Sequence, residues 1–458
     1  MDTTTASPAP ASKKPGFLIN RNFAFLWGGQ SISNVGDFVF DTTLVLWIAT
    51  IIARGQSWAP LAVSGVLLAT SVPIFLVGPI AGVFVDRWDK RRTMLAMDAT
   101  RSVLIALLLL VATGNFPAPW QLGLIYAVVF LASACAQFFN PARFTFISDI
   151  VEESYRARAS GLGQTTQSLA GIIGPPIAAP LLFVIGVQWA LIVNSLSFVV
   201  SFLAILAVRV PPSASGDEAA KHGTFFQDFC AGIRFFASNR VLVTILITII
   251  LVALGAGAIN ALGVFFVTQN LHVPANLYGF MDAAFGIGAV VGAILASVFA
   301  ARIGEARTFW IGLLAVGISI LILARMTSFA LGVVFLALVG LTIAPVNVVI
   351  GPLILHVTPR ELIGRVMAVI TPTNALASIV SVAIAGTLAS TVLGGLHTTL
   401  LGLAFSPIDT IFTGTGVLVI LGGLYAMLSL RGVILAHPKA SEAVAIPAGG
   451  DGQIATEA

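Results

Sequence analysis

Between two long apolar runs, the chain reads Gly78-Pro79-Ile80-Ala81-Gly82-Val83-Phe84-Val85-Asp86-Arg87-Trp88-Asp89-Lys90-Arg91-Arg92. The first eight of these residues continue an apolar run, and six of the last seven are charged. A helix needs about 20 mostly apolar residues to cross the hydrocarbon core of a bilayer. The stretch is therefore interpreted as the end of one membrane-crossing helix and the short charged loop that leads into the next.

The composition of the whole chain supports the same interpretation. Of its 458 residues, 58% are hydrophobic and only 9% are charged, whereas an average soluble domain carries about 25% charged residues. This lack of polar surface excludes a soluble enzyme, and the high hydrophobicity excludes a disordered chain. The formal net charge of +4 does not indicate nucleic-acid binding, because the basic residues occupy short loops between apolar runs.

Twelve runs are long and apolar enough to cross a bilayer, which predicts an all-α membrane protein with twelve transmembrane helices. The runs cover residues 22–53, 60–85, 93–113, 119–141, 159–185, 188–208, 240–269, 276–301, 308–326, 328–355, 365–394 and 409–430. With both chain ends placed in the cytoplasm, 20 of the 23 Lys and Arg residues fall on the cytoplasmic side. The positive-inside rule therefore predicts a multi-pass protein of the cell (inner) membrane with both termini cytoplasmic.

A polar segment in the middle of the chain divides the spans six and six. We predict a disordered N-terminus (1–20), a six-helix bundle (21–208), a cytoplasmic linker (209–239), a second six-helix bundle (240–430) and a disordered tail (431–458). Five apolar residues of the linker share one helical face: Phe225, Phe226, Phe229, Ile233 and Phe236. They predict a short amphipathic helix, which either lies on the membrane surface or packs on the underside of the protein itself.

The two predicted bundles share sequence markers at a spacing of 210 or 211 residues. The marker pairs are Gly78 and Gly288, Gly82 and Gly292, Arg92 and Arg302, and Pro141 and Pro352. Several markers at one spacing, which also matches the division into six and six, indicate an internal duplication. Duplicated bundles around a midplane site are typical of secondary transporters.

The stretch from Gly78 to Arg92 resembles the signature loop between helices 2 and 3 of the major facilitator superfamily, where small residues precede Asp-Arg and a basic cluster. Three further stretches resemble the subgroup that contains macrolide-efflux and enterobactin-exporter proteins: Asn22 to Trp27 with Gly36-Asp37, Phe139 to Arg143, and Thr358 to Arg365. The resemblance covers nearly all of residues 20–430. It implies the major facilitator fold, with two pseudo-symmetric six-helix bundles, and the activity of a drug–proton antiporter.

The signature loop places an acid at a helix end beside several cations. Asp86 is expected to join an ion-pair cluster or to face the N-terminus of the helix near Gly364, where the helix dipole favours an anion. Either contact would hold the bundles together on the cytoplasmic side. The predicted gate comprises Gly78, Gly82, Asp86, Arg87, Arg91, Arg92, Asp98 and Arg101. Two alternatives stay open: the basic residues only set the topology, and Asp98 pairs locally with Arg101 at spacing i,i+3.

The first span carries four polar residues on one helical face: Gln30, Asn34, Asp37 and Asp41. At about 100° per residue they fall within roughly 60° of one another. An ionised carboxylate near mid-membrane costs at least ~2.5 kcal/mol, and burial and like charge both favour the protonated carboxyl group. One hypothesis is a proton-coupling site that faces a central cavity. The alternative is that a fixed arginine neutralises one of the two aspartates.

Polar side chains also form a stripe in the eleventh span, consisting of Thr371, Asn374, Ser378 and Ser381. The first three are candidate substrate contacts, although such side chains also hold membrane helices together. The segment from Gly171 to Pro176 resembles the Gly-Pro helix motif of drug–proton antiporters. Those antiporters commonly carry a basic residue inside helix 4. Nothing from Trp120 to Pro141 is basic, so their proton relay is not expected to be intact here.

The chain contains no glycine-rich loop ending in Gly-Lys-Ser/Thr for ATP and no His-Glu-x-x-His or paired Cys-x-x-Cys motif for a metal ion. No cofactor, bound metal or enzymatic activity is therefore expected. The expected partners are a small-molecule substrate, protons and the lipid bilayer, and the expected state is a monomer. The sequence predicts proton-coupled efflux of an amphipathic drug, macrolide or siderophore by alternating access. Alternatives are a lipid or nutrient carrier of the same fold and a membrane receptor or sensor with a transporter-like body.

Overall fold

A computed structural model of the chain describes five segments: residues 18–209, 238–359, 362–396, 398–400 and 403–431. The predicted amphipathic helix in the linker lies outside these segments. So do most of the two chain ends that were predicted to be disordered.

The N-terminal half consists of seven α-helices, two of which continue into a π-helical turn. They are α1 (Arg21–Trp47) with η1 (Ile48–Ile52), α2 (Ala59–Leu76), α3 (Gly78–Arg87), α4 (Lys90–Thr113), α5 (Ala118–Ile150), α6 (Glu153–Pro180) with η2 (Leu181–Ile185), and α7 (Val187–Ala207).

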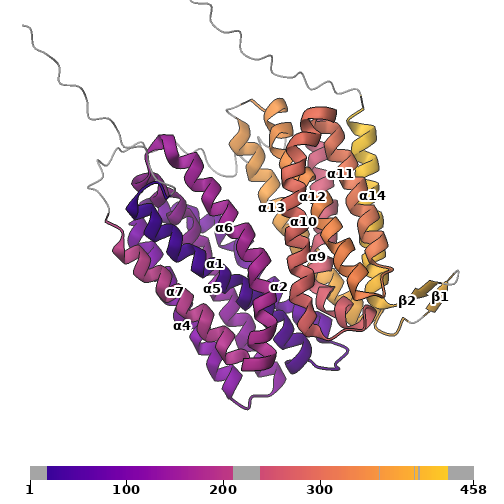
Figure 1. Cartoon of the computed structure of the whole chain (residues 1–458), viewed down its shortest axis with the longest axis horizontal. Coiled ribbons are helices and arrows are strands. Elements are labelled where there is room, and N and C mark those ends of the chain that lie inside the picture. The colour runs from indigo at the N-terminus through magenta and orange to yellow at the C-terminus, as the bar shows by residue number, and fades with distance from the viewer. Residues whose placement is uncertain (1–17, 210–237, 360–361, 397, 401–402, 432–458) are drawn as a thin grey trace, which may run out of the picture.

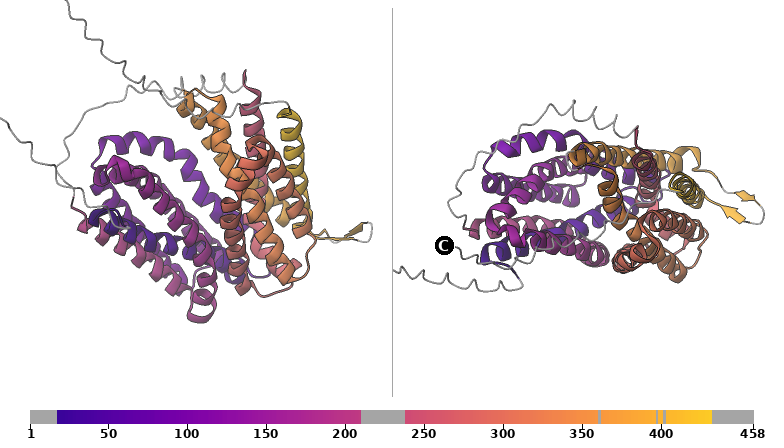
Figure 2. Two further views of the ribbon diagram at one scale, coloured as in Figure 1. Left: turned by 45° about the horizontal axis from the view of Figure 1, so that its top comes forward. Right: turned by 90° about the horizontal axis from the view of Figure 1, so that it is seen from above.

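The C-terminal half adds a short hairpin to its helices. Its elements are α9 (Arg240–Phe265) with η3 (Phe266–Asn270), η4 (Ala275–Leu277), α10 (Tyr278–Ile303), α11 (Glu305–Leu323), α12 (Phe329–Val357), α13 (Ile363–Thr387) with η6 (Leu388–Val392), β1 (Thr398–Leu400), β2 (Leu403–Phe405) and α14 (Pro407–Ser429). The antiparallel hairpin β1–β2 projects away from this half (Figures 1 and 2). Within the described residues, twelve helical segments are long and apolar enough to cross a membrane, as predicted.

Each half repeats the same arrangement of helices. In the N-terminal half, α1 lies against α6 and α7, and α4 lies against α5 and α7. In the C-terminal half, the corresponding α9 lies against α13 and α14, and α11 lies against α12 and α14. The π-helical turns that follow α1 and α6 recur after α9 and α13. The structure thus confirms an all-α membrane fold of two pseudo-symmetric six-helix bundles (Figure 1).

The buried apolar side chains form one cluster common to both halves and two separate clusters. The common cluster, which includes Val63 and Leu262, lies at the end of the molecule away from the chain termini, here called the far end. Toward the termini, one cluster around Phe146 belongs to the N-terminal half, and another around Leu353 belongs to the C-terminal half. The halves therefore meet at the far end and separate toward the end that carries the termini, the termini end (Figure 1).

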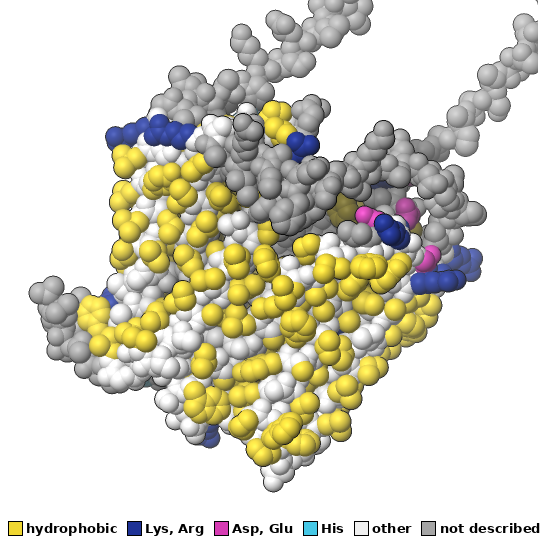
Figure 3. All heavy atoms as spheres, turned by 180° about the vertical axis from the view of Figure 1, so that it is seen from behind, with side chains coloured by type: hydrophobic (Ala, Val, Ile, Leu, Met, Phe, Trp, Pro, Cys, Tyr) yellow, Lys and Arg dark blue, Asp and Glu magenta, His cyan; other side chains and the backbone are white. Residues whose placement is uncertain are grey.

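The outer surface matches a bilayer rather than water. Large apolar side chains such as Leu110 and Val184 are exposed along the helices, with 62% and 82% of their area accessible. Figure 3 shows apolar side chains across the middle of one face, while most visible Lys and Arg side chains lie toward the termini end. Such a continuous apolar belt would be unstable in water and stable among lipid chains.

The second and fourth spans depart most from the prediction, and α6 begins at Glu153 and not at residue 159. The second span, predicted over residues 60–85, is divided between α2 and α3 at Val77, because Pro79 has no N–H to continue the helical hydrogen bonds. The fourth span, predicted to end at residue 141, continues through Pro141 to Ile150. Membrane helices tolerate an internal proline where neighbouring groups satisfy the freed carbonyl. Arg143 is consequently a helix residue and not a loop residue.

Candidate functional site

The two halves touch at the far end mainly through two helix pairs, α2 with α13 and α6 with α10, and to a smaller extent through α2 with α9. Glycine allows the close approach in both pairs. A Cβ on Gly279 of α10 would overlap the Pro175 carbonyl oxygen of α6, and a Cβ on Gly386 of α13 would overlap the Ser64 side chain of α2. The Leu61 N–H also donates to Ser390 Oγ at 3.1 Å. This end of the molecule is therefore closed.

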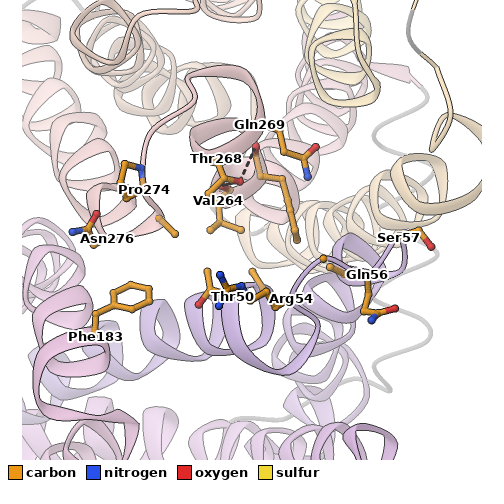
Figure 4. A pocket seen from close by; sticks show the side chains of 15 residues that line it. Thr50, Arg54, Gln56, Ser57, Phe183, Val264, Thr268, Gln269, Pro274 and Asn276 are labelled. Carbon is orange, nitrogen blue, oxygen red and sulfur yellow. Dashed lines mark hydrogen bonds between the residues drawn. The ribbon is translucent and has the colours of Figure 1, made fainter.

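A polar pocket of about 840 Å³ remains between the halves at the far end. Figure 4 shows Thr50, Arg54 and Phe183 of the N-terminal half across from Thr268 and Asn276 of the C-terminal half. Thr268 Oγ1 donates to the Val264 carbonyl at 3.1 Å, which holds this side chain against its own helix. The pocket exists only where both halves contribute walls, so its shape depends on how the halves are arranged.

A second cavity, of about 630 Å³, lies inside the N-terminal half toward the termini end. Side chains of α1, α4, α5 and α6 line it. Four of the predicted residues are among them: Gln30, Asn34, Asp37 and Arg101. The remaining lining is amphipathic, with the rings of Trp27 and Phe139 beside amide and hydroxyl groups. The predicted polar face of the first span therefore borders a cavity large enough for a small molecule.

Asp37 and Arg101 form an ion pair across this cavity. One guanidinium nitrogen of Arg101, on α4, donates to both carboxylate oxygens of Asp37, on α1, at 3.2 and 3.1 Å. The guanidinium also lies 4.0 Å from the ring centroid of Phe198 of α7, a cation–π geometry. In this conformation Asp37 is thus paired with an arginine, the contact that the second of the two alternatives requires.

The predicted local pair between Asp98 and Arg101 is not formed, because Arg101 faces α1. Asp98 instead accepts a hydrogen bond of 2.5 Å from Ser201 of α7. Gln30 donates to the same serine at 2.7 Å and accepts from Arg143 of α5 at 3.2 Å. A continuous chain of hydrogen bonds thus joins Arg143 to Asp98 and involves three helices besides α4.

Asp41 is the most exposed of the four polar residues predicted on the first span. It lies one helical turn beyond Asp37, is exposed, and does not line the cavity. Within the described segments it makes no ion pair. The two aspartates of the first span therefore have different surroundings, since only Asp37 has a guanidinium partner.

Of the predicted gate residues, Asp98 and Arg101 belong to the interior contacts described above, and those of the loop itself lie at the termini end. Asp86 and Arg87 are exposed, and among the residues that the structure describes no cation pairs with the Asp86 carboxylate. Asp89 caps α4 by accepting from the Arg92 N–H at 2.6 Å, and Arg91 donates to the Leu206 carbonyl at 2.7 Å. The loop is thus anchored to its own half, and the predicted cluster around Asp86 is not formed in this conformation.

The two glycines of the gate have free space beside them. A Cβ on Gly82 would meet nothing within 4 Å, and one on Gly78 would come no closer than 3.6 Å to Gln137. Their counterparts Gly288 and Gly292 are packed so closely that a Cβ would overlap backbone carbonyls of α12. In this conformation, the glycine pair that the two halves share therefore makes a close helix contact only in the second half.

The predicted stripe on α13 does not gather around one cavity. Ser381 donates to the Leu254 carbonyl of α9, so it joins two helices. Asn374 lines a small cavity of about 70 Å³ in the C-terminal half. Thr371 is exposed and Ser378 is half-buried. None of them lines the cavity that holds Asp37.

Two ionisable residues on membrane-spanning helices were missed by the sequence reasoning. Arg143 was counted with the loops, although it supplies a basic residue inside the fourth membrane helix. Asp282 of α10 lines a third cavity, in the C-terminal half. A single acid within the apolar run 276–301 was the signal that could have identified it. In the described part of the chain, no group of three or more His, Cys, Asp or Glu side chains is arranged to hold a metal ion.

Comparisons with known proteins agree with this architecture. A family model described as transmembrane secretion effector matches residues 15–413. The multidrug efflux pump Tap of Mycobacterium tuberculosis is 28% identical over 349 residues, which cover 75% of this chain and 81% of Tap. Macrolide efflux protein A of Streptococcus pyogenes is 23% identical over 349 residues, which cover 76% of this chain and 84% of that protein.

A solved structure supports the fold independently of close sequence similarity. The crystal structure of a bacterial homologue of the human lysosomal transporter Spinster, in an inward-facing and unoccupied conformation, superposes with a TM-score of 0.67 at 15% identity. The match covers 90% of this chain and 98% of that one. Because the family model matches most of its length, this chain belongs to the transmembrane secretion effector family of major facilitator superfamily transporters.

Proposed function

We propose that the protein is a proton-coupled secondary transporter that exports amphipathic small molecules, such as a drug, macrolide or siderophore, by alternating access. The main support is a group of five ionisable side chains on membrane-spanning helices of the N-terminal half: Asp37, Asp98, Arg101 and Arg143, which are enclosed, and Asp41, which is exposed on α1. Three carboxylates and two guanidinium groups leave one negative charge, which one bound proton would neutralise. Ionisable residues at membrane depth are costly and are typical of ion or proton pathways.

The geometry supports a mechanism in which a proton changes a helix contact. A proton on Asp37 would remove the charge that attracts Arg101, and the guanidinium would then be drawn toward Asp98 on its own helix. The contact between α1 and α4 would weaken in one protonation state and form in the other. A proton can shift the equilibrium between two conformations only through such a difference in interaction.

The direction of export and the membrane orientation have separate support. Two relatives are named efflux proteins. In the described loops, Arg54 and Arg325 lie at the far end, while the other cations gather at the termini end. By the positive-inside rule, this distribution favours a cytoplasmic position for the termini end. We therefore infer an inner-membrane protein that opens toward the cytoplasm in this conformation, and we propose that it works as a monomer.

We further propose that the loop between α3 and α4 acts as a gate when the cytoplasmic end closes. The Asp86 carboxylate is exposed and pairs with no cation among the described residues, so it is available to meet the N-terminus of α13. Gly82 has open space beside it, which would accommodate the approaching helix. Thr371, Asn374 and Ser378 on α13 would then face the cavity in which substrate is enclosed.

Transport by the full chain in liposomes tests the proposed function. An imposed pH gradient should accelerate the flux of a radiolabelled macrolide through the wild-type protein. Asp37→Asn and Asp41→Asn should retain downhill flux but lose the acceleration by the gradient. Asp149→Asn is the matched control, because this exposed acid at the end of α5 does not line the cavity.

Two results would contradict the proposal. If both variants in α1 transported with the wild-type rate and pH dependence, the role of these aspartates would be excluded. If the macrolide bound without crossing the membrane, a receptor or sensor would explain the protein better than a transporter.

A further inference from the structure

The C-terminal half contains a cavity that the proposed proton network does not use. It has a volume of about 180 Å³ and lies among α9, α10, α11, α12 and α14. Most of its lining is aliphatic or aromatic. The polar side chains in this lining are Asn260 of α9 and Tyr278 and Asp282 of α10. A single carboxyl group is thus presented to an apolar chamber.

Asp282 makes no ion pair within the part of the chain that the structure describes. Its side-chain partner is Tyr278, one helical turn earlier. The Tyr278 ring packs on Gly263 of α9, where an added Cβ would come within 3.1 Å of it. Asp282 therefore has a positioned neighbour but no neutralising charge, unlike Asp37.

Aromatic rings form part of the walls around this carboxylate. Phe266, Phe285 and Phe412 all line the cavity, and the rings of Phe266 and Phe412 stack with centroids 5.1 Å apart. The faces of aromatic rings attract organic cations, most strongly where water is excluded. A chamber with aromatic walls and one unneutralised carboxylate matches the chemistry of an ammonium group that carries apolar substituents.

The position of Asp282 along α10 connects it to the contact between the halves. Gly279 and Gly286 are the residues at which α10 packs closely on α6 of the other half. At about 100° per residue, Asp282 lies only about 40–60° around the helix from these two glycines. A ligand held by Asp282 would therefore lie beside the surface that must separate when the far end opens.

We propose that Asp282 and the surrounding aromatic side chains bind the ammonium group of a cationic amphipathic substrate. This inference rests on the proposed function and adds the chemical class of the substrate. The cavity is smaller than the roughly 300–1,000 Å³ of sites that enclose a whole ligand. It therefore holds the ammonium group and its nearest apolar substituent, while the rest of the substrate lies between the halves.

Binding of benzyltrimethylammonium to the purified full chain tests the proposal. This probe is small and carries a permanent charge, and its uncharged isostere is 2,2-dimethylpropylbenzene, in which carbon replaces nitrogen. Calorimetry should show that Asp282→Asn weakens binding of the cation at least tenfold and that Asp282→Glu retains most of the affinity. Protection against thermal unfolding by the isostere should be the same in all three proteins. Glu305→Gln, which removes a carboxylate at the start of α11 outside this cavity, should bind the cation as the wild type does.

A second variant keeps the test decisive if Asp282→Asn does not yield folded protein. Phe285→Leu removes an aromatic wall and keeps the charge, so it should weaken binding of the cation several-fold and leave the isostere unaffected. The proposal is overturned if the wild type does not bind the cation, or if a folded Asp282 or Phe285 variant binds it with unchanged affinity.

The flux assay separates this proposal from the proposed function. Loss of cation binding in Asp282→Asn, together with an absence of pH-driven flux in wild-type liposomes, would support the subsite and contradict the transport function. Normal pH-driven flux, together with unchanged cation binding by Asp282→Asn, would support the transport function and contradict the subsite.

Discussion

Arg101 interacts with two helices from its position on α4. Its guanidinium contacts both carboxylate oxygens of Asp37 on α1 and lies over the ring of Phe198 on α7. A lysine could supply the charge but not the planar group that stacks on the ring. The side chain of Arg101 is only 14% exposed and that of Asp37 is 32% exposed, so solvent screens the pair only in part.

The strength of this pair can be measured with a double-mutant cycle. Arg101→Gln should lower the free energy of unfolding, because it leaves the Asp37 carboxylate at membrane depth without a cation. Asp37→Asn combined with Arg101→Gln should recover part of the loss. Partial exposure of Asp37 argues for a coupling free energy of about 1 kcal/mol, within the usual range for contacting residues. The measurement is reversible unfolding of the four proteins in detergent micelles.

Asp41 provides the control for this cycle, since it lies on the same helix and does not contact Arg101 directly. The same cycle with Asp41→Asn should give a smaller coupling than the cycle with Asp37→Asn. Equal coupling in the two cycles would show that general charge balance, and not the pair with Asp37, determines stability here.

Sequence reasoning identified the charged residues of the N-terminal cavity better than their partners. The polar face of α1 could be predicted because helical periodicity alone places Gln30, Asn34 and Asp37 on one side. The partner of Arg101 could not, because i,i+3 spacing favours Asp98 and only the packing of α4 against its neighbours brings Arg101 to Asp37. Asp282 could have been found, since an acid within an apolar run is a functional candidate by itself.

At the scale of helices, glycine determines which pairs of helices approach closely. On α10, Gly288 and Gly292 face carbonyl groups of α12, whereas Gly279 and Gly286 face α6 of the other half. The first pair of glycines stabilises the C-terminal bundle, and the second pair allows the two bundles to touch. A substitution at Gly279 should therefore change the arrangement of the halves more than the bundle itself.

Gly279→Ala should disfavour closure of the far end. Its Cβ would overlap the backbone carbonyl of Pro175, which cannot rotate away, and such overpacking typically costs about 1–3 kcal/mol. The substitution Thr268→Cys, in a background with Cys135→Ala and Cys230→Ala, would place a thiol in the lining of the far-end pocket. Its labelling by a membrane-impermeant maleimide should become about tenfold faster in the Gly279→Ala protein.

Gly123→Ala is the matched control, because a Cβ at this position of α5 has nothing within 4 Å. Its labelling rate should equal that of the parent protein. Unchanged labelling in the Gly279→Ala protein would show that the contact between α6 and α10 does not control the far end.

The ends of helices were harder to predict than their number. Hydropathy located all twelve spans because each must present about 20 apolar residues to lipid. It did not show that α5 passes through Pro141 or that the second span breaks at Val77. The effect of a proline depends on whether neighbouring groups satisfy the carbonyl that it frees, and the sequence around it does not contain that information.

For the whole molecule, the two main contacts between the halves are related by the internal duplication. The pair α2 with α13 corresponds to the pair α10 with α6, because α2 and α10 form the second membrane span of their halves and α6 and α13 form the fifth. Both pairs meet at the far end, where the common apolar cluster lies. A symmetric pair of contacts favours rocking of two rigid bundles, as in other transporters built from repeats. The duplication was visible in the sequence, but the end at which the halves meet was not, since one sequence must serve both conformations.

A reversible disulfide should show whether transport requires this rocking. The Cβ of Ile172 on α6 lies 3.7 Å from the position of a Cβ on Gly286 of α10, close to the mean of about 3.8 Å in disulfides. We expect Ile172→Cys with Gly286→Cys, in the background without Cys135 and Cys230, to cross-link under mild oxidation. Oxidised protein in liposomes should lose nearly all flux, and reduction should restore it, because the bond holds the halves together at the far end.

The single variants Ile172→Cys and Gly286→Cys should keep their flux under the same oxidation, which separates cross-linking from general damage. Oxidised protein should still bind substrate, since the cavities of both halves lie outside the bond. Full transport by completely cross-linked protein would mean that α6 and α10 stay together throughout the cycle. The protein would then have to switch its opening from one side of the membrane to the other without separating α6 from α10. This outcome would contradict the rocking motion that the paired contacts favour.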